Sequence, residues 1–383
     1  MKKVAIIGGG ISGLYIASLL RQNPNYEIIV YEKNNSVNLE KGYGIQLSVN
    51  SIKLLNKIGF QNVSLSDKFF PNKVDFYSLK NKNKICDLDL STFNDSEDKY
   101  TTLQRFTLIE FLKNRLPDNL INYNKKVVEV QNMSEIIKIT FQDDSSIECD
   151  YLIISDGTFS NTKSLIEKKK IKPKYFNSVA IRATIDENDL QDIDPKNISL
   201  FLGSNFHSVV YPINKKGQFN FVGILRKSLN NLELADHKLF DTKDFVSSIL
   251  LEISKQIDKN IIKNLKSIKC FPVFVSTEIF QPKNKNIFII GDAFFTFPPT
   301  FAQGASQSIE VAHELYNSFE NKKNQFNIER IKRTKMIDRK SRLNYFAFHI
   351  SNSLIISVRN LLIKYLVKNE RFIDNYLGKI YKD

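Results

Sequence analysis

Three glycines near the N-terminus have the spacing of a phosphate-binding turn. Gly8, Gly10 and Gly13 form the pattern G-x-G-x-x-G, between an apolar run at residues 4–7 and a stretch with helical spacing at residues 11–20. Glycines at these positions permit a tight turn, a close approach of the backbone to a pyrophosphate, and close packing of the helix on the strand. The pattern therefore predicts a nucleotide-binding turn between a strand and a helix.

The residues that follow this turn add two further features of a dinucleotide site. Ile11 and Ser12 open the expected helix, and the amide groups at a helix N-terminus favour the negative charge of a pyrophosphate. Glu32 lies nineteen residues beyond Gly13, at the end of a second β-rich run at residues 27–31. A carboxylate there can accept hydrogen bonds from a ribose, and it disfavours a phosphorylated ribose. We therefore expect a βαβ unit that binds a dinucleotide.

Two later segments each consist of an apolar strand that ends in an aspartate beside a glycine. Residues 149–157 read C-D-Y-L-I-I-S-D-G and end in Asp156 and Gly157, and residues 286–293 read N-I-F-I-I-G-D-A and contain Asp292. An aspartate at such a junction can bind a polyol chain. The nucleotide-binding unit is therefore expected to be assembled from separated segments of the chain.

A helix is expected shortly after the second of these segments. It opens at Gly304 and Ala305 and runs through Leu315. The N-terminal amides of this helix can face a flavin ring and stabilise negative charge on its reduced form. Together with the two aspartate junctions, this helix favours FAD as the dinucleotide.

With these motifs the chain resembles the group A flavoprotein aromatic hydroxylases, in the branch of salicylate, hydroxybenzoate and hydroxynicotinate hydroxylases, over nearly its whole length. The resemblance implies FAD as cofactor, NAD(P)H as a transient co-substrate, and a flavin C4a-hydroperoxide that hydroxylates a phenolic acid-like substrate with O2. It also implies that Asp156 and Gly157 lie near FAD and NAD(P)H, and that Asp292 binds the ribityl chain. Arg105, within residues 102–108 (T-L-Q-R-F-T-L), corresponds to an FAD-contacting arginine. Gly44, within residues 42–47 (G-Y-G-I-Q-L), lies in the loop beside the isoalloxazine.

His207 and Tyr211 are the candidate catalytic residues. They are four residues apart in F-H-S-V-V-Y-P, and on a strand this spacing puts both side chains on one face. The resemblance implies that they orient and deprotonate the phenol of the substrate, and a histidine titrates in the range that a base requires. The alternative reading, a buried core histidine beside a packed tyrosine, stays open at this stage.

Arg182 and Phe294 are the candidate substrate-binding residues. Arg182, in I-R-A, resembles the arginine of a family strand and is a candidate partner for a substrate carboxylate. The alternative is that Arg182 forms a structural ion pair. Phe294 and Phe295 follow G-D-A where the family usually has Ala-His-Pro, so an aromatic ring replaces an imidazole. This departure predicts an unusually apolar active-site wall.

Composition excludes several other classes of protein. The net charge is +14, but lysines are scattered without basic patches interleaved with aromatics, so we expect no nucleic-acid partner. The three cysteines have no C-x-x-C spacing, which argues against disulfides, zinc and a redox pair and fits a reducing, cytoplasmic setting. The histidines have no metal-ligand spacing, and no segment reads as a membrane span. The apolar N-terminus carries the glycine motif and is not read as a signal peptide.

The expected fold class is α/β, with a Rossmann-type FAD-binding domain interleaved with an antiparallel-sheet substrate domain and followed by a helical C-terminus. We assign residues 1–75, 100–168 and 280–325 to the FAD-binding domain, and residues 76–99 and 169–279 to the substrate domain. Residues 326–383 form the C-terminal helical region. The oligomeric state is left as monomer or homodimer.

Three alternatives to a phenolic acid hydroxylase stay open. A ubiquinone-biosynthesis ring hydroxylase would suit basic C-terminal helices that make peripheral contact with a membrane, although we expect those helices to pack on the FAD-binding domain instead. A flavin-dependent isoprenoid reductase would not incorporate oxygen. An inactive FAD-binding protein would show no turnover at all.

Overall fold

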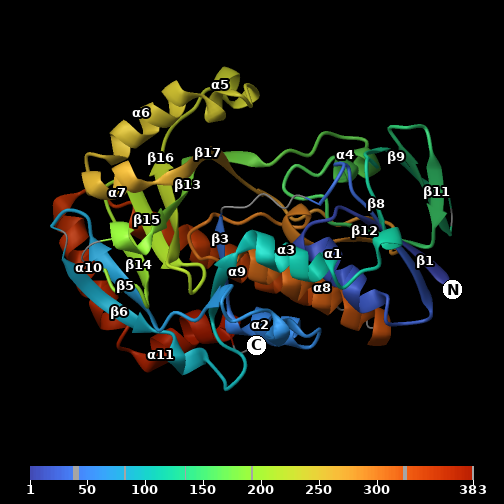
Figure 1. The fold of residues 1–383 in the computed structure, drawn as a ribbon. Helices are drawn as coiled ribbons and strands as arrows, with labels where there is room; N and C mark the ends of the chain where they lie inside the picture. The colour runs from blue at the N-terminus through green and yellow to red at the C-terminus, as the bar shows by residue number, and fades with distance from the viewer. Residues whose placement is uncertain (38–42, 82, 134, 191–192, 322–325, 382–383) are drawn as a thin grey trace.

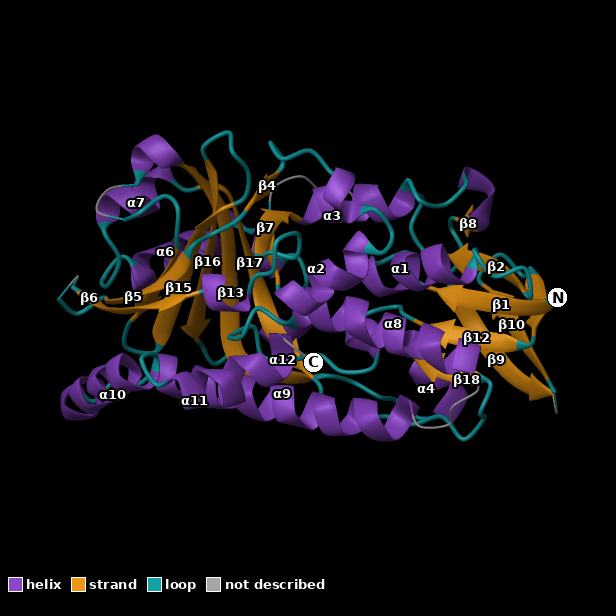
Figure 2. Cartoon of the chain, turned by 90° about the horizontal axis from the view of Figure 1, so that it is seen from below, coloured by secondary structure: helices purple, strands orange, loops and turns teal. Residues whose placement is uncertain are grey.

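Two units built on β-sheets lie side by side in the computed structural model, which describes residues 1–37, 43–81, 83–133, 135–190, 193–321 and 326–381. Figure 1 shows a parallel sheet at the end of the molecule that holds the N-terminus, and a larger, mostly antiparallel sheet at the other end. In the view from below in Figure 2, the helices of residues 326–373 run along the lower edge of the picture, past both units.

The first unit contains a parallel five-stranded sheet in the order β18-β12-β1-β2-β8. These strands are short and largely apolar, which is typical of a parallel sheet covered on both faces. Val4 and Ile6 of β1 point toward helices on one face, and Ala5 and Ile7 point to the opposite face. The strands are β1 (Lys2–Ile7), β2 (Tyr26–Tyr31), β8 (Ile121–Asn122), β12 (Tyr151–Ile154) and β18 (Ile287–Ile289).

Helices cover one face of this sheet, and a small antiparallel sheet with one helix covers the other. The helices of the first face share one hydrophobic cluster with Val4 and Ile6, so apolar side chains cover this face of the sheet. They are α1 (Ile11–Leu20), α2 (Val49–Asn56), α3 (Arg105–Lys113) and α8 (Gly304–Asn321). The second face carries β9 (Val127–Met133), β10 (Ile136–Phe141), β11 (Ser146–Cys149) and α4 (Asn161–Glu167).

The second unit is a seven-stranded sheet in the order β17-β13-β16-β15-β14-β5-β6, in which only the pair β14 and β5 is parallel. Alternate residues of each strand point to opposite faces. Phe206 and Val210 of β15 pack with α6, whereas His207 and Tyr211 point to the other face. The strands are β5 (Lys73–Ser78), β6 (Lys84–Asp89), β13 (Lys174–Asp186), β14 (Ile198–Leu202), β15 (Phe206–Pro212), β16 (Gln218–Arg226) and β17 (Lys266–Val275). The helices on the first of these faces are α5 (Asn231–Ala235), α6 (Lys243–Ile253) and α7 (Lys259–Asn264).

A small three-stranded sheet joins the two units. Its strands are β3 (Gly44–Leu47), β7 (Thr101–Gln104) and β4 (Lys68–Phe69), in the order β3-β7-β4. Gly44 N donates to Asn220 Oδ1 at 2.7 Å, and Thr102 Oγ1 donates to the Pro212 oxygen at 2.5 Å. Both bonds reach from this small sheet to the seven-stranded sheet, so they fix the position of one unit against the other.

In the described residues after position 325, the chain forms α9 (Phe326–Phe348), α10 (Ser353–Leu366), α11 (Glu370–Ile373), a π-helical turn η7 (Asp374–Gly378) and α12 (Lys379–Tyr381). The sequence predicted that this region packs on the FAD-binding domain. Helix α9 does contact α8, but α10 packs against β6, at the edge of the seven-stranded sheet. The expectation was therefore wrong for α10, whose inward residues complete the cluster around Phe76 and Leu202.

The α/β class, the discontinuous parallel sheet and the helical C-terminus agree with the sequence prediction. The domain boundary expected at residue 76 differs slightly from the sheets, because β5 begins at Lys73. No helix within the described ranges is long and apolar enough to cross a bilayer.

Candidate active site

The turn between β1 and α1 is closely packed at two of its glycines and open at the third. Gly8 has φ of +109°, and a Cβ there would lie 2.5 Å from the Ser155 oxygen. A Cβ at Gly13 would lie 2.1 Å from the Gly8 oxygen, so these two positions admit no side chain. A Cβ at Gly10 would meet no described atom within 4 Å. The open space therefore lies directly over the N-terminus of α1.

No side chain caps the N-terminus of α1, and no acidic residue lies in its first turn. The first amides of a helix, here those of Ile11 and Ser12, have no partner within the helix. Such a terminus favours an anion. The arrangement suits the pyrophosphate that the sequence motif predicts.

Glu32 lies beside this turn, at the end of β2. Its Oε2 accepts a hydrogen bond from Gly9 N at 2.8 Å, and its Oε1 accepts from the backbone and side-chain nitrogens of Asn34 at 3.0 and 2.8 Å. Oε2 accepts only one of these bonds and has a second lone pair. Glu32 is thus held in place by the protein and retains acceptor capacity for a ribose.

The two aspartate junctions lie at the carboxyl ends of adjacent parallel strands, β12 and β18. Ligands of open α/β sheets bind at this edge. The loops that follow the strands are joined, because Thr296 Oγ1 donates to Thr158 Oγ1 at 3.1 Å. Asp156 Oδ2 accepts from Thr162 Oγ1 at 2.7 Å, whereas its Oδ1 is buried and has no hydrogen-bond partner in the structure. Gly157, with φ of +83°, borders open space.

Asp292 lies opposite the β1–α1 turn. The adjacent Gly291 has φ of +63°, and a Cβ there would lie 2.3 Å from Ser12 Oγ, so the two loops touch. The Asp292 side chain is accessible at the surface, yet protein atoms surround it, and it lines a small pocket together with Gly291 and Gly304. We call the surface around this pocket and the β1–α1 turn the concavity. This desolvation raises the pKa of Asp292 to about 6, against the opposing charge of Arg105. Arg105, the first residue of α3, therefore lies near Asp292.

The N-terminus of α8 completes the same concavity. A Cβ at Gly304 would meet no described atom within 4 Å, and Ala305 follows it in the first turn. Ala302, just before the helix, has φ of +50°. Gln303 Nε2 is buried without a partner in the structure.

The concavity fits FAD on observations that do not depend on any motif. Three glycines, Gly10, Gly157 and Gly304, border open space. Two buried polar atoms, Asp156 Oδ1 and Gln303 Nε2, find no partner within the described residues. Buried polar groups in folded proteins are normally satisfied, so these atoms indicate a polar ligand.

Tyr211, Arg182 and Gly44 come together on the face of the seven-stranded sheet that meets β3. Arg182 Nη1 donates to the Gly44 oxygen at 3.3 Å. Burial raises the pKa of the Tyr211 hydroxyl, while Arg182 and the side-chain amides of Gln46 and Asn220 act to lower it. A Cβ at Gly44 would lie 2.9 Å from Tyr211 Cε2 and 2.5 Å from Ile213 Cγ2. The missing side chain of Gly44 thus permits contact between the two units, a different reason from the flavin approach that the sequence suggested; Gly42 lies outside the described residues.

Sequence reasoning missed the polar neighbours of Tyr211. Tyr100 Oη donates to Gln46 Oε1 at 2.8 Å, and Asn220 is fully buried and accepts from Gly44 N through its Oδ1. Gln46 belongs to the loop motif at residues 42–47, which is the only signal that could have singled it out. Asn220 lies on β16, opposite Tyr211 in the register, and only strand pairing reveals it.

His207 is buried and pairs with a second histidine. Its Nδ1 lies 3.2 Å from Nε2 of His349, and its ring packs near Phe348, with 5.3 Å between the ring centroids. His349 Nδ1 also lies 2.8 Å from the backbone carbonyl oxygen of Tyr345, and His349 Nε2 lies 3.1 Å from the backbone carbonyl oxygen of Ile224. Burial, with a smaller contribution from His349, lowers the pKa of His207 well below its ordinary value. The imidazole is therefore neutral near pH 7.

The structure does not bring His207 and Tyr211 to one point. Both lie on β15 and share a face, but four residues at about 3.3 Å per residue separate them by about 13 Å. That distance exceeds the span of one aromatic ring. Tyr211 lies at the end that meets β3, and His207 lies at the end that meets α9.

Phe294 occupies a different place from the one the sequence suggested. It is 5% exposed and packs with Ala293 and Phe295 in the hydrophobic cluster beneath the parallel sheet. It therefore supports the loop that carries Asp292, and it does not share the sheet face of Arg182 and Tyr211.

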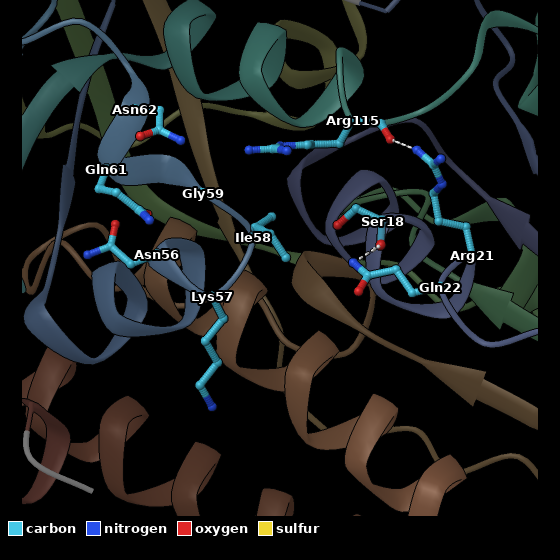
Figure 3. A pocket seen from close by; sticks show the side chains of 10 residues that line it. All are labelled: Ser18, Arg21, Gln22, Asn56, Lys57, Ile58, Gly59, Gln61, Asn62 and Arg115. Atoms are coloured by element: carbon cyan, nitrogen blue, oxygen red, sulfur yellow. Dashed lines mark hydrogen bonds between the residues drawn. The ribbon is translucent and has the colours of Figure 1, made fainter.

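A pocket of about 560 Å³ lies away from all of these residues. Figure 3 shows Arg21, Lys57 and Arg115 among the side chains that line it. Arg21 follows the C-terminal end of α1, whereas the glycines lie at its N-terminal end. Ten residues of helix separate the two places by about 15 Å. A second pocket, of about 770 Å³, opens between β13, β17 and α9, where Tyr345 forms part of its wall.

A glycine turn, two aspartate loops and a helix N-terminus around one concavity define a nucleotide-binding flavoprotein. Residues 1–322 match the family described as FAD binding domain, and the chain belongs to this family. FAD is therefore its cofactor.

Named relatives are more distant. The chain is 21% identical to salicylate hydroxylase of Pseudomonas putida over 238 residues. This alignment covers 57% of this chain and 53% of the relative. It is 23% identical over 332 residues to 6-hydroxynicotinate 3-monooxygenase of Bordetella bronchiseptica, which covers 83% and 82%. The chain spans about half the length of the first curated relatives that it matches. HpxO of Klebsiella pneumoniae, solved with FAD and uric acid, superimposes with a TM-score of 0.81 at 16% identity, over 99% of this chain and 96% of that one, which shows a shared fold.

Proposed function

We propose that this chain is a monooxygenase that hydroxylates a small aromatic, phenolic acid-like substrate with NAD(P)H and O2. The observation that carries the proposal is the contact of Arg182 and Tyr211 with Gly44, because it puts a cation and a phenol at the junction between the sheet and the FAD-binding unit. The names of the relatives, which include salicylate and hydroxynicotinate hydroxylases, support the same class of substrate.

When bound, FAD would take electrons from NAD(P)H and activate O2, so that one oxygen atom enters the ring as a hydroxyl group and the other leaves as water. Asp292, Glu32 and the N-terminus of α1 would hold the ribityl, ribose and pyrophosphate groups. The N-terminus of α8 at Gly304 would favour negative charge at the flavin ring. Asp156 Oδ1 would receive the hydrogen bond that it lacks in the structure.

Arg182 and Tyr211 would position the substrate. A guanidinium is suited to a carboxylate, and Arg182 is partly exposed on the sheet face with its Nη1 already fixed on Gly44. The Tyr211 hydroxyl remains protonated because burial raises its pKa, so it can donate a hydrogen bond to a phenolate oxygen. A phenolate is a more electron-rich ring than a phenol, which favours attack by an electrophilic oxygen.

His207 stays a candidate proton acceptor, and its place in the fold sets a condition on that role. It is neutral, as a base must be, but its Nδ1 is engaged by His349 and it lies about 13 Å along β15 from Tyr211. A substrate with one aromatic ring at Tyr211 would not span this distance, and His207 could accept a proton at Nδ1 only if the imidazole pair opened. The geometry therefore favours Tyr211 over His207 as the residue that contacts the phenol.

Two variants separate these roles. We expect Tyr211→Phe to lower hydroxylation about 100-fold or more, the usual effect of removing a hydrogen-bond donor to negative charge in an active site, and to leave FAD affinity unchanged. If His207 is the base, His207→Ala will show the same selective loss, and if it is a core residue, FAD affinity and stability will fall together with activity. Full hydroxylation by Tyr211→Phe would contradict the assignment of this site.

The function itself is tested by anaerobic reduction of the flavin with NADH or NADPH, with and without a panel of phenolic acids. A large increase in the reduction rate with one part of the panel would support a substrate-gated aromatic hydroxylase, and subdivision would then identify the substrate. The panel should include phenols with long alkyl chains, which represent the ubiquinone-type alternative. Reduction that is indifferent to every phenol would argue for the isoprenoid reductase or the inactive protein.

A further inference from the structure

Helix α10 exposes a continuous apolar face. Six large side chains on it are between 51% and 78% exposed, although apolar residues of this size are usually buried. Their spacing of i, i+1, i+4, i+7, i+8 and i+11 puts them on one side of a helix with 3.6 residues per turn. They are Leu354, Ile355, Val358, Leu361, Leu362 and Tyr365. We call this set the α10 face.

The opposite side of α10 is firmly attached to the protein. Ile363 and Val367 pack in the cluster that contains Phe348 and residues of β5 and β6. Arg359 is 5% exposed and its Nη1 donates to the Ala347 oxygen at 3.3 Å. Figures 1 and 2 both place α10 at the end of the molecule away from the N-terminus. The α10 face is thus presented outward by a docked helix.

The chain segment that contains α10 carries only basic charges. From residue 339 to residue 369 the sequence contains no aspartate or glutamate and six basic residues. Lys364 and Lys368 are exposed and lie along one edge of the α10 face. Asp87, on the adjoining strand β6, is already paired with Lys73 and Lys84. A second copy of the chain would bring the basic residues of this segment together, with Glu370 as the first exposed acid that follows them, whereas an anionic lipid surface would neutralise them.

We propose that α10 is a membrane-contact helix that lies in the plane of an anionic phospholipid bilayer. The α10 face enters the boundary between headgroups and acyl chains, and Lys364 and Lys368 reach the lipid phosphates. The helix has 14 residues, so it rests on the bilayer and does not cross it. This contact goes beyond the proposed reaction and holds whichever aromatic substrate the protein takes.

The chain contains no tryptophan, so one introduced tryptophan reports on its own surroundings. In Val358→Trp holoprotein we expect a blue-shifted emission maximum and quenching by brominated lipids when vesicles of phosphatidylcholine with about one third phosphatidylserine are added. The matched control is Leu251→Trp on α6, where the native side chain is 69% exposed outside the α10 face. The control should not respond. An unchanged spectrum of Val358→Trp with these vesicles would overturn the proposal.

Sedimentation with the same vesicles tests the apolar and the charged parts separately. The double variant Leu361→Asp with Leu362→Asp should bind vesicles at least about tenfold more weakly, while Leu251→Asp binds like the parent protein. The double variant Lys364→Glu with Lys368→Glu should lose the preference for phosphatidylserine over phosphatidylcholine alone. All variants should keep the flavin absorbance spectrum, because none of these residues contacts the FAD concavity.

Self-association is the outcome that would replace this proposal. A stable dimer in analytical ultracentrifugation that the Leu361→Asp and Leu362→Asp pair dissociates, together with no vesicle binding by the parent protein, would assign the α10 face to a second copy. A monomer that binds anionic vesicles and releases them at high salt supports the membrane contact.

Discussion

Asp292 is a carboxylate whose surroundings in the protein alone do not suit its charge. Loss of solvation raises its pKa to about 6, and the charge of Arg105 only partly offsets this effect. A polyol that donates hydrogen bonds to the carboxylate would supply the missing stabilisation. The residue is therefore better suited to the complex with FAD than to the apoprotein.

Asp292→Asn is expected to weaken FAD binding and to stabilise the apoprotein at pH 7.5. A hydrogen bond to a charged group contributes about 1.5–3 kcal/mol, so FAD affinity should fall at least about tenfold. Between pH 3.8 and about 6 the folded state binds more protons than the unfolded state, so this carboxylate lowers stability as the pH rises through that window. FAD titration and thermal unfolding of the apoprotein at several pH values measure both effects. An apoprotein variant with a lower Tm than the parent at pH 7.5 would contradict this account.

The pair of His207 and His349 has the opposite pH dependence. Burial lowers the pKa of both imidazoles, so the folded state stays neutral while the unfolded state takes up protons below about pH 6.5. Stability is therefore lost as the pH falls below that value. We expect His207→Phe to reduce the fall in Tm between pH 7 and pH 5, and His237→Gln, at an exposed position, to leave that fall as it is in the parent. Equal slopes for parent and His207→Phe would contradict a lowered pKa of His207 in the folded protein.

At the scale of elements, two glycines of the β1–α1 turn have different roles: Gly13 permits close packing, and Gly10 leaves space open. Gly13→Ala puts a Cβ 2.1 Å from the Gly8 oxygen, so α1 must move away from β1 and both stability and FAD binding should fall. Gly10→Ala meets no described atom and has an ordinary φ of −87°, so the apoprotein should unfold at the parent temperature. If a pyrophosphate fills the space over Gly10, this variant should still lose FAD affinity. Unchanged FAD affinity in a folded Gly10→Ala protein would place the cofactor elsewhere.

The parallel sheet could be predicted from the sequence because its signals are local. Each strand is a short apolar run that ends in a chemically distinctive residue, such as Glu32, Asp156 or Asp292. The hairpin of β5 and β6 was harder to place. Its pairing with β14 joins residues more than a hundred positions apart, and such contacts leave no periodicity in either segment.

The sheet side of the candidate site was only partly predictable for the same reason. The spacing of His207 and Tyr211 predicted that both side chains lie on one face of the strand. It could not predict which residues they contact, because those contacts depend on tertiary packing. His207 meets His349, which lies 142 residues away just beyond the end of α9, and Tyr211 meets the Gly44 loop. Whether a histidine on a strand faces a substrate or a second histidine depends on which element covers it.

At the scale of the whole molecule, buried ion pairs connect the C-terminal helices to the FAD-binding unit. Arg330 Nη1 of α9 donates to Glu310 Oε1 of α8 at 2.9 Å, and Arg333 Nη2 donates to Glu310 Oε2 at 3.0 Å. Burial acts to raise the pKa of Glu310, but the two arginines outweigh it and leave the pKa lowered. Arg333 Nη2 also donates to the Ile380 oxygen at 3.0 Å, so the end of the chain is tied to the same carboxylate.

Glu310→Ala should therefore loosen the whole C-terminal region from the FAD-binding unit. Arg330 is only 2% exposed and, among the described residues, would keep only its longer ion pair with Glu314, at 3.4 Å, so the loss should approach the cost of about 3–5 kcal/mol for breaking a buried ion pair. Lys266→Ala, which removes the exposed ion pair with Asp186, should leave the free energy of unfolding nearly unchanged, because solvent and salt screen such a pair. Urea unfolding of both apoproteins gives the comparison, and limited proteolysis should cleave Glu310→Ala within residues 326–381 first. Equal losses in the two variants would mean that apolar packing of α9, and not the carboxylate, holds the C-terminal helices. A larger loss for Glu310→Ala would show that α8, the helix that opens at Gly304, also anchors the C-terminal region.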